Sequence, residues 1–455
     1  MPVVDTYKAI LATDADPGHR WNATLPTGTP IIVTYRFPAG ADLPPLELTY
    51  YDGTRVSAFD ARERRAFRQA TEEYERVAGI RFVEVDGPAM VDAYNIAGIG
   101  SRYESFAGYA NYPYVNDRVT SHGDLVMNVP DPAEWTPGRS GFTVLLHELG
   151  HAVGLKHTHE GRTKLSGEID DHDHTVMTYE WGTDDNPQTL QTLDRQALRH
   201  LYGRPQDTED WTFRYKPGPG ILEIEGGRGN DTILVPAGNI RASGAGGRDR
   251  LHGREDGDHL YGGGGHDVLR GNAGADVLSG QRGADRLFGD TGRDTLLGGP
   301  DNDKLVGGRG ADDLRGGGGQ DRLTGSNGQD LLRGGGGTDR LKGGCADDEL
   351  RGGAGADWLD GGAGDDILRG QGGQDRFVFR DGHDRIADWR DGETIVVDRA
   401  ALDATGLRRA DLRDMAEIDG DEIVFAFNSA DSLTLDLGRH GGIALGHVLD
   451  DVVLI

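Results

Sequence analysis

The chain contains 455 residues, of which 27% are charged, and it carries a formal net charge of −28 at pH 7. This length allows two or three domains, and the acidic balance argues against nucleic acid or an anionic membrane surface as a partner. The single cysteine, Cys345, excludes an intrachain disulfide.

The N-terminal segment lacks the basic region and long apolar run of a Sec-type signal peptide, and no later segment resembles a transmembrane span. We therefore expect no membrane insertion.

The first part of the chain predicts strands alternating with helices. Residues 31–37 form an apolar strand pattern between two prolines, and Asp60 with Glu63 has the spacing of a helix capping box. The helix that follows carries apolar residues at helical spacing and is expected to stop at Gly79. Further short strands are expected at residues 80–85, 91–99, 106–112 and 124–128.

The string HELGHAVGLKH, which starts at His147, predicts a zinc site. His147 and His151 are four residues apart, so on a helix their imidazoles share one face and can reach a single ion. Gly154 can end that helix, which would turn the chain and bring in His157 as a third ligand. Three neutral imidazoles leave a tetrahedral Zn²⁺ with one open position for water, whose pKa the ion lowers to about 7. Glu148, beside the first ligand, is placed to act as the general base.

The pattern HExxHxxGxxH is the signature of metzincin zinc proteases. Downstream of His157, the sequence TVMTYEW contains Met177 and Tyr179, and this spacing resembles the Met-turn of the serralysin family of bacterial zinc proteases. The resemblance implies that Met177 forms an apolar floor beneath the zinc. It also implies that the Tyr179 hydroxyl is a loose additional zinc ligand that stabilises the oxyanion of the tetrahedral intermediate, so Tyr179 would be both catalytic and metal-binding.

Other segments match the family less closely. Residues 108–113 resemble its edge strand above the cleft, where an extended peptide substrate pairs by β-addition, although an ordinary edge strand would look the same. The loop after His157 lacks the Pro-Gly-Asp stretch expected of the family, and extra histidines stand at His159, His172 and His174. These could hold a second metal or belong to a solvated polar loop.

A closing helix over residues 189–203 and a Pro/Gly linker at residues 216–220 precede a nine-residue repeat. Its purest copy is GGRGNDTIL, which begins at Gly226 and matches the calcium-binding RTX nonapeptide. In this register 17 of the 18 positions from 231 to 384 are aspartate, and only Ile240 interrupts the run. The predicted calcium-binding residues are Asp231, Asp249, Asp258, Asp267, Asp276, Asp285, Asp294, Asp303, Asp312, Asp321, Asp330, Asp339, Asp348, Asp357, Asp366, Asp375 and Asp384.

The period also predicts the architecture of this region. Two nine-residue halves make one 18-residue turn of a parallel β-roll, and the Leu, Ile or Phe two residues after each aspartate points inward. Each aspartate then faces an equivalent loop one turn along. Carboxylate and carbonyl oxygens around a roomy loop suit several structural Ca²⁺ ions better than Mg²⁺. The loops form stacks of nine and eight, so ions sandwiched between neighbours would fill at most 15 sites.

The repeats also indicate where the protein works. A calcium-dependent roll is useful where Ca²⁺ is near millimolar, which means outside the cell. The resemblance to RTX proteins implies type I secretion from a Gram-negative bacterium, through an ABC transporter that reads an uncleaved C-terminal signal. The chain ends DDVVLI, which looks like the end of such a signal and also like an ordinary terminal strand.

Together these patterns predict an α+β metzincin-like zinc protease domain at residues 16–216, followed by an all-β parallel β-roll (RTX) domain at residues 217–386. Residues 387–455 would form a C-terminal β region with the secretion signal. Residues 1–15 are a candidate propeptide, because they precede the family-like stretch that begins at Gly18.

The predicted function is that of a secreted, monomeric zinc-dependent endopeptidase, with one catalytic Zn²⁺ and several structural Ca²⁺ ions, acting on proteins and peptides. The alternative is a calcium-dependent adhesin or surface protein with a vestigial protease domain. However, a domain that had lost its protease activity should first have lost Glu148 and the three histidines, which are all present. Another RTX enzyme, such as a lipase or an epimerase, would need a different catalytic constellation, and no G-x-S-x-G occurs.

Overall fold

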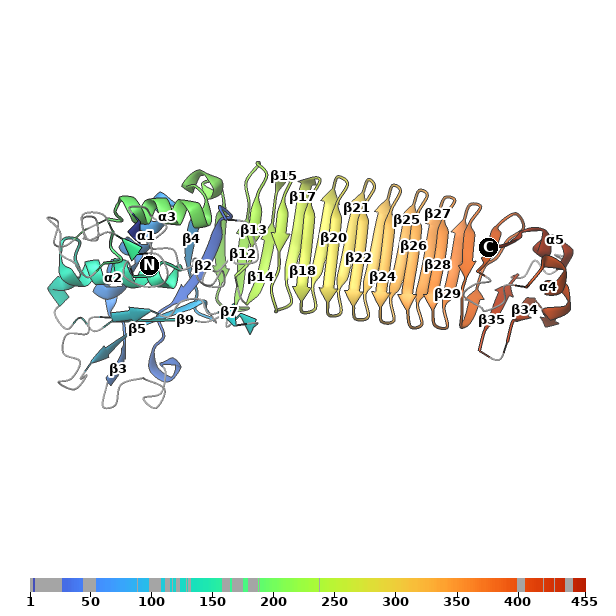
Figure 1. The fold of residues 1–455 in the computed structure, drawn as a ribbon, viewed down its shortest axis with the longest axis horizontal. Coiled ribbons are helices and arrows are strands. Elements are labelled where there is room, and N and C mark those ends of the chain that lie inside the picture. Colours follow the sequence, from blue (N-terminus) through green and yellow to red (C-terminus); the bar gives the residue numbers. More distant parts are fainter. Residues whose placement is uncertain are drawn as a thin grey trace. The chain divides into compact units, whose positions relative to one another are not determined.

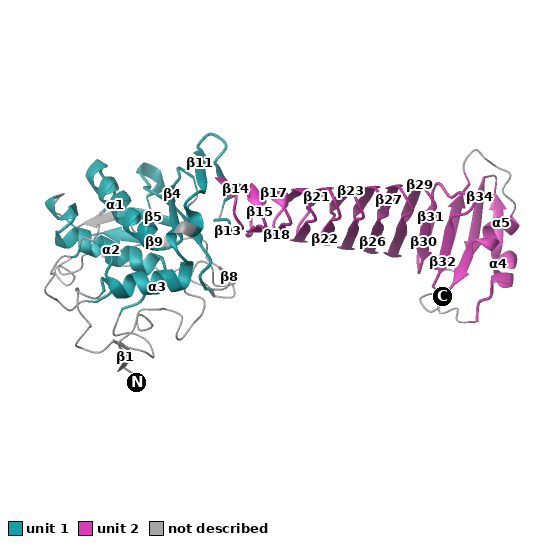
Figure 2. Cartoon of the chain, turned by 90° about the horizontal axis from the view of Figure 1, so that it is seen from above, with its two compact units in different colours: residues 1–223, 234–238 teal, residues 224–233, 239–455 magenta. Residues whose placement is uncertain are grey.

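The computed structural model describes residues 3–4, 27–43, 55–87, 89–97, 108–110, 115–116, 118–119, 123–127, 129, 132–157, 164–165, 175–178, 187, 189–236, 238–398, 406–419, 421–428, 430–437 and 445–455. The chain divides into two compact units, one of residues 1–223 with 234–238 and the other of residues 224–233 with 239–455 (Figure 2). No helix in the described segments is long and apolar enough to cross a membrane.

The first unit is built on a mixed sheet, which has six strands among the described residues (Figure 1). The order is β4-β2-β5-β9-β6, in which the first four strands are parallel and β6 is antiparallel to β9, while β3 pairs antiparallel with β5. The strands are β2 (Ile31–Arg36), β3 (Arg55–Ala58), β4 (Ile80–Glu84), β5 (Val91–Ala97), β6 (Gly108–Ala110) and β9 (Gly123–Met127). A strand is present in each of the regions where the sequence predicts one, and β3 is a further strand that the sequence did not predict.

Three helices accompany this sheet, namely α1 (Ala61–Val77), α2 (Ser140–Ala152) and α3 (Thr192–Tyr202). The predicted capping box starts α1, since the Asp60 carboxylate accepts from the Glu63 amide at 2.9 Å while Glu63 accepts from the Asp60 amide. Shorter elements are β1 (Val3–Val4), which pairs with β10 (Lys164–Leu165), the pair β7 (Val115–Asn116) and β8 (Arg118–Val119), and the 3-10 helices η3 (Gly40–Asp42), η5 (Pro132–Trp135) and η6 (Pro205–Thr208).

The core of the first unit fixes the position of α2. Apolar residues of β2, β4, β5 and β9 and of the three helices form one buried cluster. Two buried tyrosines in it donate to the backbone of the α2 segment, Tyr74 of α1 to the Leu146 carbonyl at 2.5 Å and Tyr202 of α3 to the Val153 carbonyl at 2.6 Å. Both the middle and the end of α2 are therefore held by neighbouring helices.

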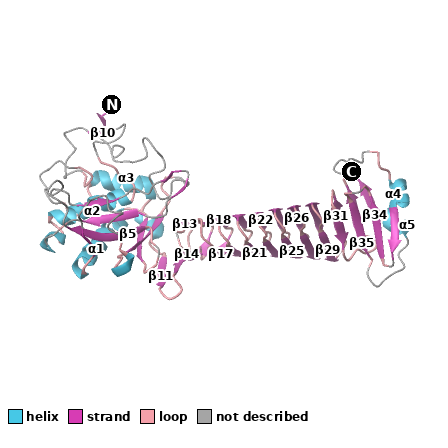
Figure 3. Ribbon diagram, turned by 90° about the horizontal axis from the view of Figure 1, so that it is seen from below, coloured by secondary structure: helices cyan, strands magenta, loops and turns pink. Residues whose placement is uncertain are grey.

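The repeats form a parallel β-roll, and Figure 3 shows that its turns consist of strands and short loops. From β14 to β30, each strand pairs with the strand 18 residues later, as Leu287 with Leu305 and Leu296 with Leu314. The elements are β11 (Thr212–Lys216), β12 (Ile221–Glu225), β13 (Thr232–Leu234), β14 (Asn239–Ser243), β15 (Gly246–Gly247), β16 (Arg250–His252), β17 (His259–Gly265), β18 (Val268–Ala273), β19 (Val277–Arg282), β20 (Arg286–Thr291), β21 (Thr295–Pro300), β22 (Lys304–Arg309), β23 (Asp313–Gly318), β24 (Arg322–Asn327), β25 (Leu331–Gly336), β26 (Arg340–Cys345), β27 (Glu349–Ala354), β28 (Trp358–Ala363), β29 (Ile367–Gly372), β30 (Arg376–Phe379), β31 (His383–Ile386) and β32 (Thr394–Val397).

The interior of the roll matches the prediction from its period. The apolar residue two positions after each aspartate is buried in every turn, from Ile233 through Leu323 to Ile386. Alternate strands belong to two different sheets, so one sheet contains β16, β18 and β20 and the other contains β17, β19 and β21. The stacked apolar residues therefore fill the space between two parallel sheets.

The segment after the repeats closes the end of both sheets. It contains α4 (Arg409–Met415), β33 (Ala416–Asp419), β34 (Glu422–Ala426), β35 (Ser432–Asp436), α5 (Leu445–Asp450) and β36 (Val452–Leu454). Strand β35 pairs with β31 and is covered in turn by β34 and β33, while β36 pairs with β32. The predicted C-terminal β region is thus present, with two short helices added to it.

Candidate metal centre

Helix α2 carries the first three residues of the predicted site. His147, Glu148 and His151 are at most 6% exposed, and most of α2 is buried with them. The helix ends at Ala152, where the backbone amide of Leu155 donates to the Gly150 carbonyl at 2.8 Å and Gly154 adopts φ +91°. The predicted glycine turn is confirmed.

This turn brings the three histidines together. His157 Nε2 lies 3.1 Å from His147 Nε2 and 3.0 Å from His151 Nε2. Within the described segments, they form the one group of three or more His, Cys, Asp or Glu side chains that could hold a metal, with ligand atoms within 4.8 Å of one another. Glu148 is outside this group, as expected of a base rather than a ligand.

Backbone carbonyls fix how two of the rings are protonated. His147 Nδ1 lies 2.7 Å from the Val176 oxygen and His151 Nδ1 lies 2.8 Å from the Leu155 oxygen. Because a carbonyl only accepts, each Nδ1 carries the proton and donates it, which leaves Nε2 unprotonated. Burial, with His147 and His157 nearby, holds the pKa of His151 well below its usual value, so the ring stays neutral. These are the protonation states that metal ligation requires.

The spacing of the Nε2 atoms fits a zinc ion. Zn–N bonds of about 2.0–2.1 Å in a tetrahedron place ligand nitrogens about 3.3–3.4 Å apart. The observed separations of 3.0 and 3.1 Å are a few tenths of an ångström shorter. The three side chains therefore suit one small N-ligated cation.

The turn at residues 175–178 packs against the back of α2. Met177 is fully buried, and a Cβ added to Gly150 would lie 2.4 Å from its sulfur, so the absence of a side chain at Gly150 makes room for Met177. The turn is tied to α3 through the buried Asp194, whose carboxylate accepts from the Thr175 hydroxyl at 2.5 Å and from the Val176 amide at 3.0 Å. Val176 in turn accepts from His147. Asp194 is thus linked to a metal-binding ring through one residue, Val176.

The repeat aspartates present an arrangement that fits calcium. Each predicted aspartate from Asp231 to Asp366 donates its amide to a carboxylate oxygen of the aspartate 18 residues later, as Asp303 does to Asp321 at 2.8 Å. In all of them except Asp231, the other carboxylate oxygen is buried with no hydrogen-bond partner. A buried, unpartnered carboxylate oxygen is costly unless a cation satisfies it. Oxygen ligands repeated in this way suit Ca²⁺.

The pKa values of these aspartates support the same conclusion. Burial, opposed by the backbone hydrogen bond, raises the pKa of Asp303 to about 7, and burial with Asp366 nearby raises that of Asp384 to about 9. At neutral pH, the carboxylates of the folded loops are therefore more stable when they are protonated or bound to a cation than when they are charged and unpaired.

Several predicted residues lie outside the part of the chain that the structure describes. These are Tyr179 and the extra histidines His159, His172 and His174. The sequence reasoning also missed three contributors, namely Gly150, Asp194 and the Val176 carbonyl. A glycine inside the zinc helix could have drawn attention to Gly150. In the sequence, Asp194 resembles any acidic residue in the first turn of a helix. The role of the Val176 carbonyl cannot be predicted from sequence, because every residue has a backbone carbonyl.

Comparison with known proteins identifies the calcium-binding repeats and finds weaker similarity to two curated proteins. A family model of the RTX calcium-binding nonapeptide repeat matches residues 223–239, 243–278, 279–314, 306–341, 315–350, 343–377 and 351–386. Serralysin of Proteus mirabilis is 25% identical over 244 residues, which are 47% of this chain and 49% of that protein. Stromelysin-3 of Rattus norvegicus is 35% identical over 77 residues, 16% of this chain and 13% of that protein. The chain spans half or less of the length of the curated relatives it matches.

Proposed function

We propose that this serralysin-like RTX protein is a zinc-dependent endopeptidase, secreted by a type I pathway and folded by calcium outside the cell. The observation that carries the proposal is the convergence of three histidine Nε2 atoms on one point. Two of the rings have their Nδ1 protons held by the Val176 and Leu155 carbonyls. A helix that merely happened to be rich in histidine would not fix the tautomers in this way.

The site residues would divide the chemistry among them. A Zn²⁺ ion held by the three histidines would supply a Lewis acid able to lower the pKa of water to about 7. Glu148, buried beside His147, would take the proton of the attacking water and pass it to the leaving amine. The resemblance to serralysins gives Tyr179 the task of stabilising the oxyanion.

The described edge of the sheet supports a peptide substrate. Strand β6 is the last strand of the order β4-β2-β5-β9-β6 and lies beside α2. An extended peptide could add to this edge through backbone hydrogen bonds, which are indifferent to sequence. The proposed substrates are therefore proteins and peptides of broad sequence.

Casein hydrolysis by the calcium-loaded full chain, with and without a zinc chelator, tests the proposal. Glu148→Gln should lower kcat about 10²–10⁴-fold with zinc still bound, because only basicity is removed. His157→Ala should lose zinc, whereas His447→Ala, an exposed histidine on α5, should change neither zinc content nor activity. Tyr179→Phe should lower kcat more than it raises KM. Parental activity of Glu148→Gln, or full zinc occupancy of His157→Ala, would overturn the assignment.

Calcium gives the proposed secretion route a physical basis. Where Ca²⁺ is scarce, the buried carboxylates should keep the roll unfolded, as passage through a narrow ABC transporter would require. Extracellular calcium modules bind at about 10⁻⁴–10⁻³ M, so folding should occur cooperatively in that range. Circular dichroism of the full chain during a calcium titration measures it. A spectrum in excess EGTA that millimolar calcium leaves unchanged would reject this folding switch.

The casein assay also separates the alternative function. A protein that binds zinc, folds with calcium and still cleaves no peptide would be better described as a calcium-dependent adhesin with a vestigial protease domain.

A further inference from the structure

The outer face of one sheet of the roll carries a row of positive charges. This sheet contains the even-numbered strands from β16 to β30. In each of them, the residue before the buried leucine or phenylalanine faces outward, because successive strand residues alternate between faces. These outward positions are in register from strand to strand, as Arg286, Lys304 and Arg322 show. Six of the eight are basic, and we call them the cationic row: Arg250, Arg286, Lys304, Arg322, Arg340 and Arg376.

The cationic row has no acidic partners. All six side chains are exposed, and none forms an ion pair with a carboxylate of the described residues. The opposite sheet also carries arginines, but acidic residues stand beside them in the ladder. There, Arg333 pairs with Asp313 at 2.6 Å and Arg369 pairs with Glu349 at 2.5 Å. The six side chains of the row thus have no carboxylate partner in a chain whose net charge is −28, although Arg270 and Asp290 of the same sheet pair with each other at 3.3 Å.

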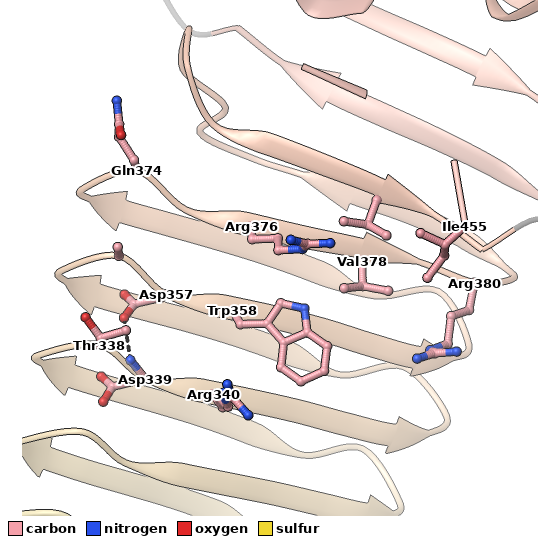
Figure 4. Close-up of a pocket in the computed structure, with 12 residues that line it drawn as sticks. Thr338, Asp339, Arg340, Asp357, Trp358, Gln374, Arg376, Val378, Arg380 and Ile455 are labelled. Carbon is pink, nitrogen blue, oxygen red and sulfur yellow. Dashed lines mark hydrogen bonds between the residues drawn. The ribbon is translucent and has the colours of Figure 1, made fainter. Parts of the chain in front are cut away.

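An aromatic ring interrupts the row. Trp358 lies between Arg340 and Arg376 in the ladder, with the Arg340 guanidinium 5.7 Å from its ring centre. Figure 4 shows these three side chains on neighbouring strands, around a hollow of about 440 Å³ that Arg380 and Val378 also line. The hollow combines a flat apolar surface with guanidinium groups on both sides.

We propose that the cationic row and Trp358 bind a linear acidic polysaccharide lying across the strands. Neighbouring strands are about 4.7–4.9 Å apart, so the four consecutive cations from Arg286 to Arg340 offer one positive charge for each sugar-sized step. Guanidinium groups bind carboxylates and sulfates in a bidentate manner, and the indole ring stacks on the apolar face of a sugar. Uronate or sulfated sugars present both features in alternation along one chain.

The same features favour a polysaccharide over nucleic acid. Nucleic-acid-binding surfaces usually belong to basic domains, whereas this chain has a pI near 4.8. Single-stranded nucleic acid also needs several aromatic side chains on which successive bases stack. The aromatic side chains beside the row, Phe288 on β20 and Trp358 on β28, are separated by β22, β24 and β26, so successive bases would not meet successive rings.

Binding of chondroitin sulfate to the calcium-loaded full chain, measured by titration calorimetry at low salt, tests the proposal. The triple variant Arg286→Ser, Arg322→Ser and Arg340→Ser should raise Kd about tenfold, since exposed ion pairs contribute modestly but add along the row. The matched control replaces three exposed arginines outside the row by serine, Arg228 in a loop and Arg282 and Arg309 at the ends of β19 and β22, and should leave Kd within about twofold. Both triples remove the same charge, and neither touches the zinc site, so casein hydrolysis reports that the protein is intact.

Trp358→Ala separates sugar binding from simple attraction of charge. It should weaken binding of chondroitin sulfate about fivefold while leaving the weaker binding of polyglutamate unchanged. Equal losses in the two triple variants would show a net-charge effect only and overturn the proposal. Failure of the parent protein to bind chondroitin sulfate, or tighter binding of single-stranded DNA, would overturn it as well.

Discussion

Replacing Asp194 with alanine should loosen the turn that carries Met177 and weaken zinc binding at the same time. The Asp194 carboxylate accepts from the Thr175 hydroxyl, from the Val176 amide and from the Gln191 amide at 2.9 Å. Its side chain is fully buried. Alanine would leave these three donors, two of them buried, without an acceptor, and Val176 would lose the contact that helps to orient its carbonyl toward His147.

The size of the effect follows from these contacts. Each buried donor left without a partner costs about 1–3 kcal/mol, and water entering the space recovers part of that, so Asp194→Ala should destabilise the first unit by about 3–5 kcal/mol. Asparagine can still accept from both amides and forfeits mainly the bond from the Thr175 hydroxyl, so Asp194→Asn should cost about 1–2 kcal/mol. Loss of an outer contact to a ligand typically lowers metal affinity about 10–100-fold.

Calorimetry and zinc titration of the calcium-loaded full chain would measure both effects. For a unit of this size, 3–5 kcal/mol corresponds to a fall of about 6–20 °C in Tm of the transition that responds to zinc removal. Asp207→Asn is the control, because Asp207 also accepts from a backbone amide, that of Arg204 at 2.7 Å, but is exposed. A large fall in Tm with unchanged zinc affinity would refute the positioning role and leave Asp194 as a structural residue.

Three further changes probe other contacts. Gly150→Ala should lower the free energy of unfolding by about 1–3 kcal/mol and weaken zinc binding, because the new Cβ would lie 2.4 Å from the Met177 sulfur. The control is Gly218→Ala, whose Cβ would have nothing within 4 Å. Equal zinc titrations of the two variants would contradict the packing argument. Gly310→Ala should shift the calcium midpoint of folding to higher concentration, because at φ +141° the new Cβ would lie 1.5 Å from the Gly292 carbonyl oxygen. The control is Gly318→Ala, whose Cβ would have no atom within 4 Å. Matching circular dichroism titrations of the two variants would reject the prediction. Calcium-depleted protein should gain β structure as the pH falls from 8 to 5. Burial raises the pKa of Asp276 from 3.8 to about 7, so the folded roll holds protons that the unfolded chain releases, and stability is lost as the pH rises through about 7. Identical spectra at the two pH values would count against this account.

The sequence predicted the parts of the site that depend on spacing along one helix or turn. His147 and His151 follow from the four-residue period of a helix, and His157 follows from the glycine that turns the chain. It could not predict that Asp194, from a helix that begins after the turn, would hold the Val176 peptide. That contact depends on how α3 packs against α2, which no local pattern encodes.

The roll could be predicted in more detail, because the length of the repeat determines the pairing register of its strands. The period of 18 residues fixes which strands pair and which side chains lie inside. The cationic row was hidden for the same reason, since its members are 18 residues apart and alternate in the sequence with those of the other sheet. Only after the two sheets are separated do these six basic side chains appear as one row along a single sheet.

The strands that close the end of the roll have a consequence for how the protein avoids self-association. A stack of parallel turns ends in two rows of exposed amide and carbonyl groups, each a template on which another chain can add. Here β35 and β36 cover those rows, and β35 is paired in turn with the antiparallel strand β34. In one sheet, antiparallel β34 and β33 break the parallel ladder, so a further copy of the repeat finds no matching edge there. The other sheet ends in β36, a strand of only three residues, which offers a short edge. A chain cut after β32 should form concentration-dependent fibrils or oligomers in calcium, while the full chain remains a single molecule.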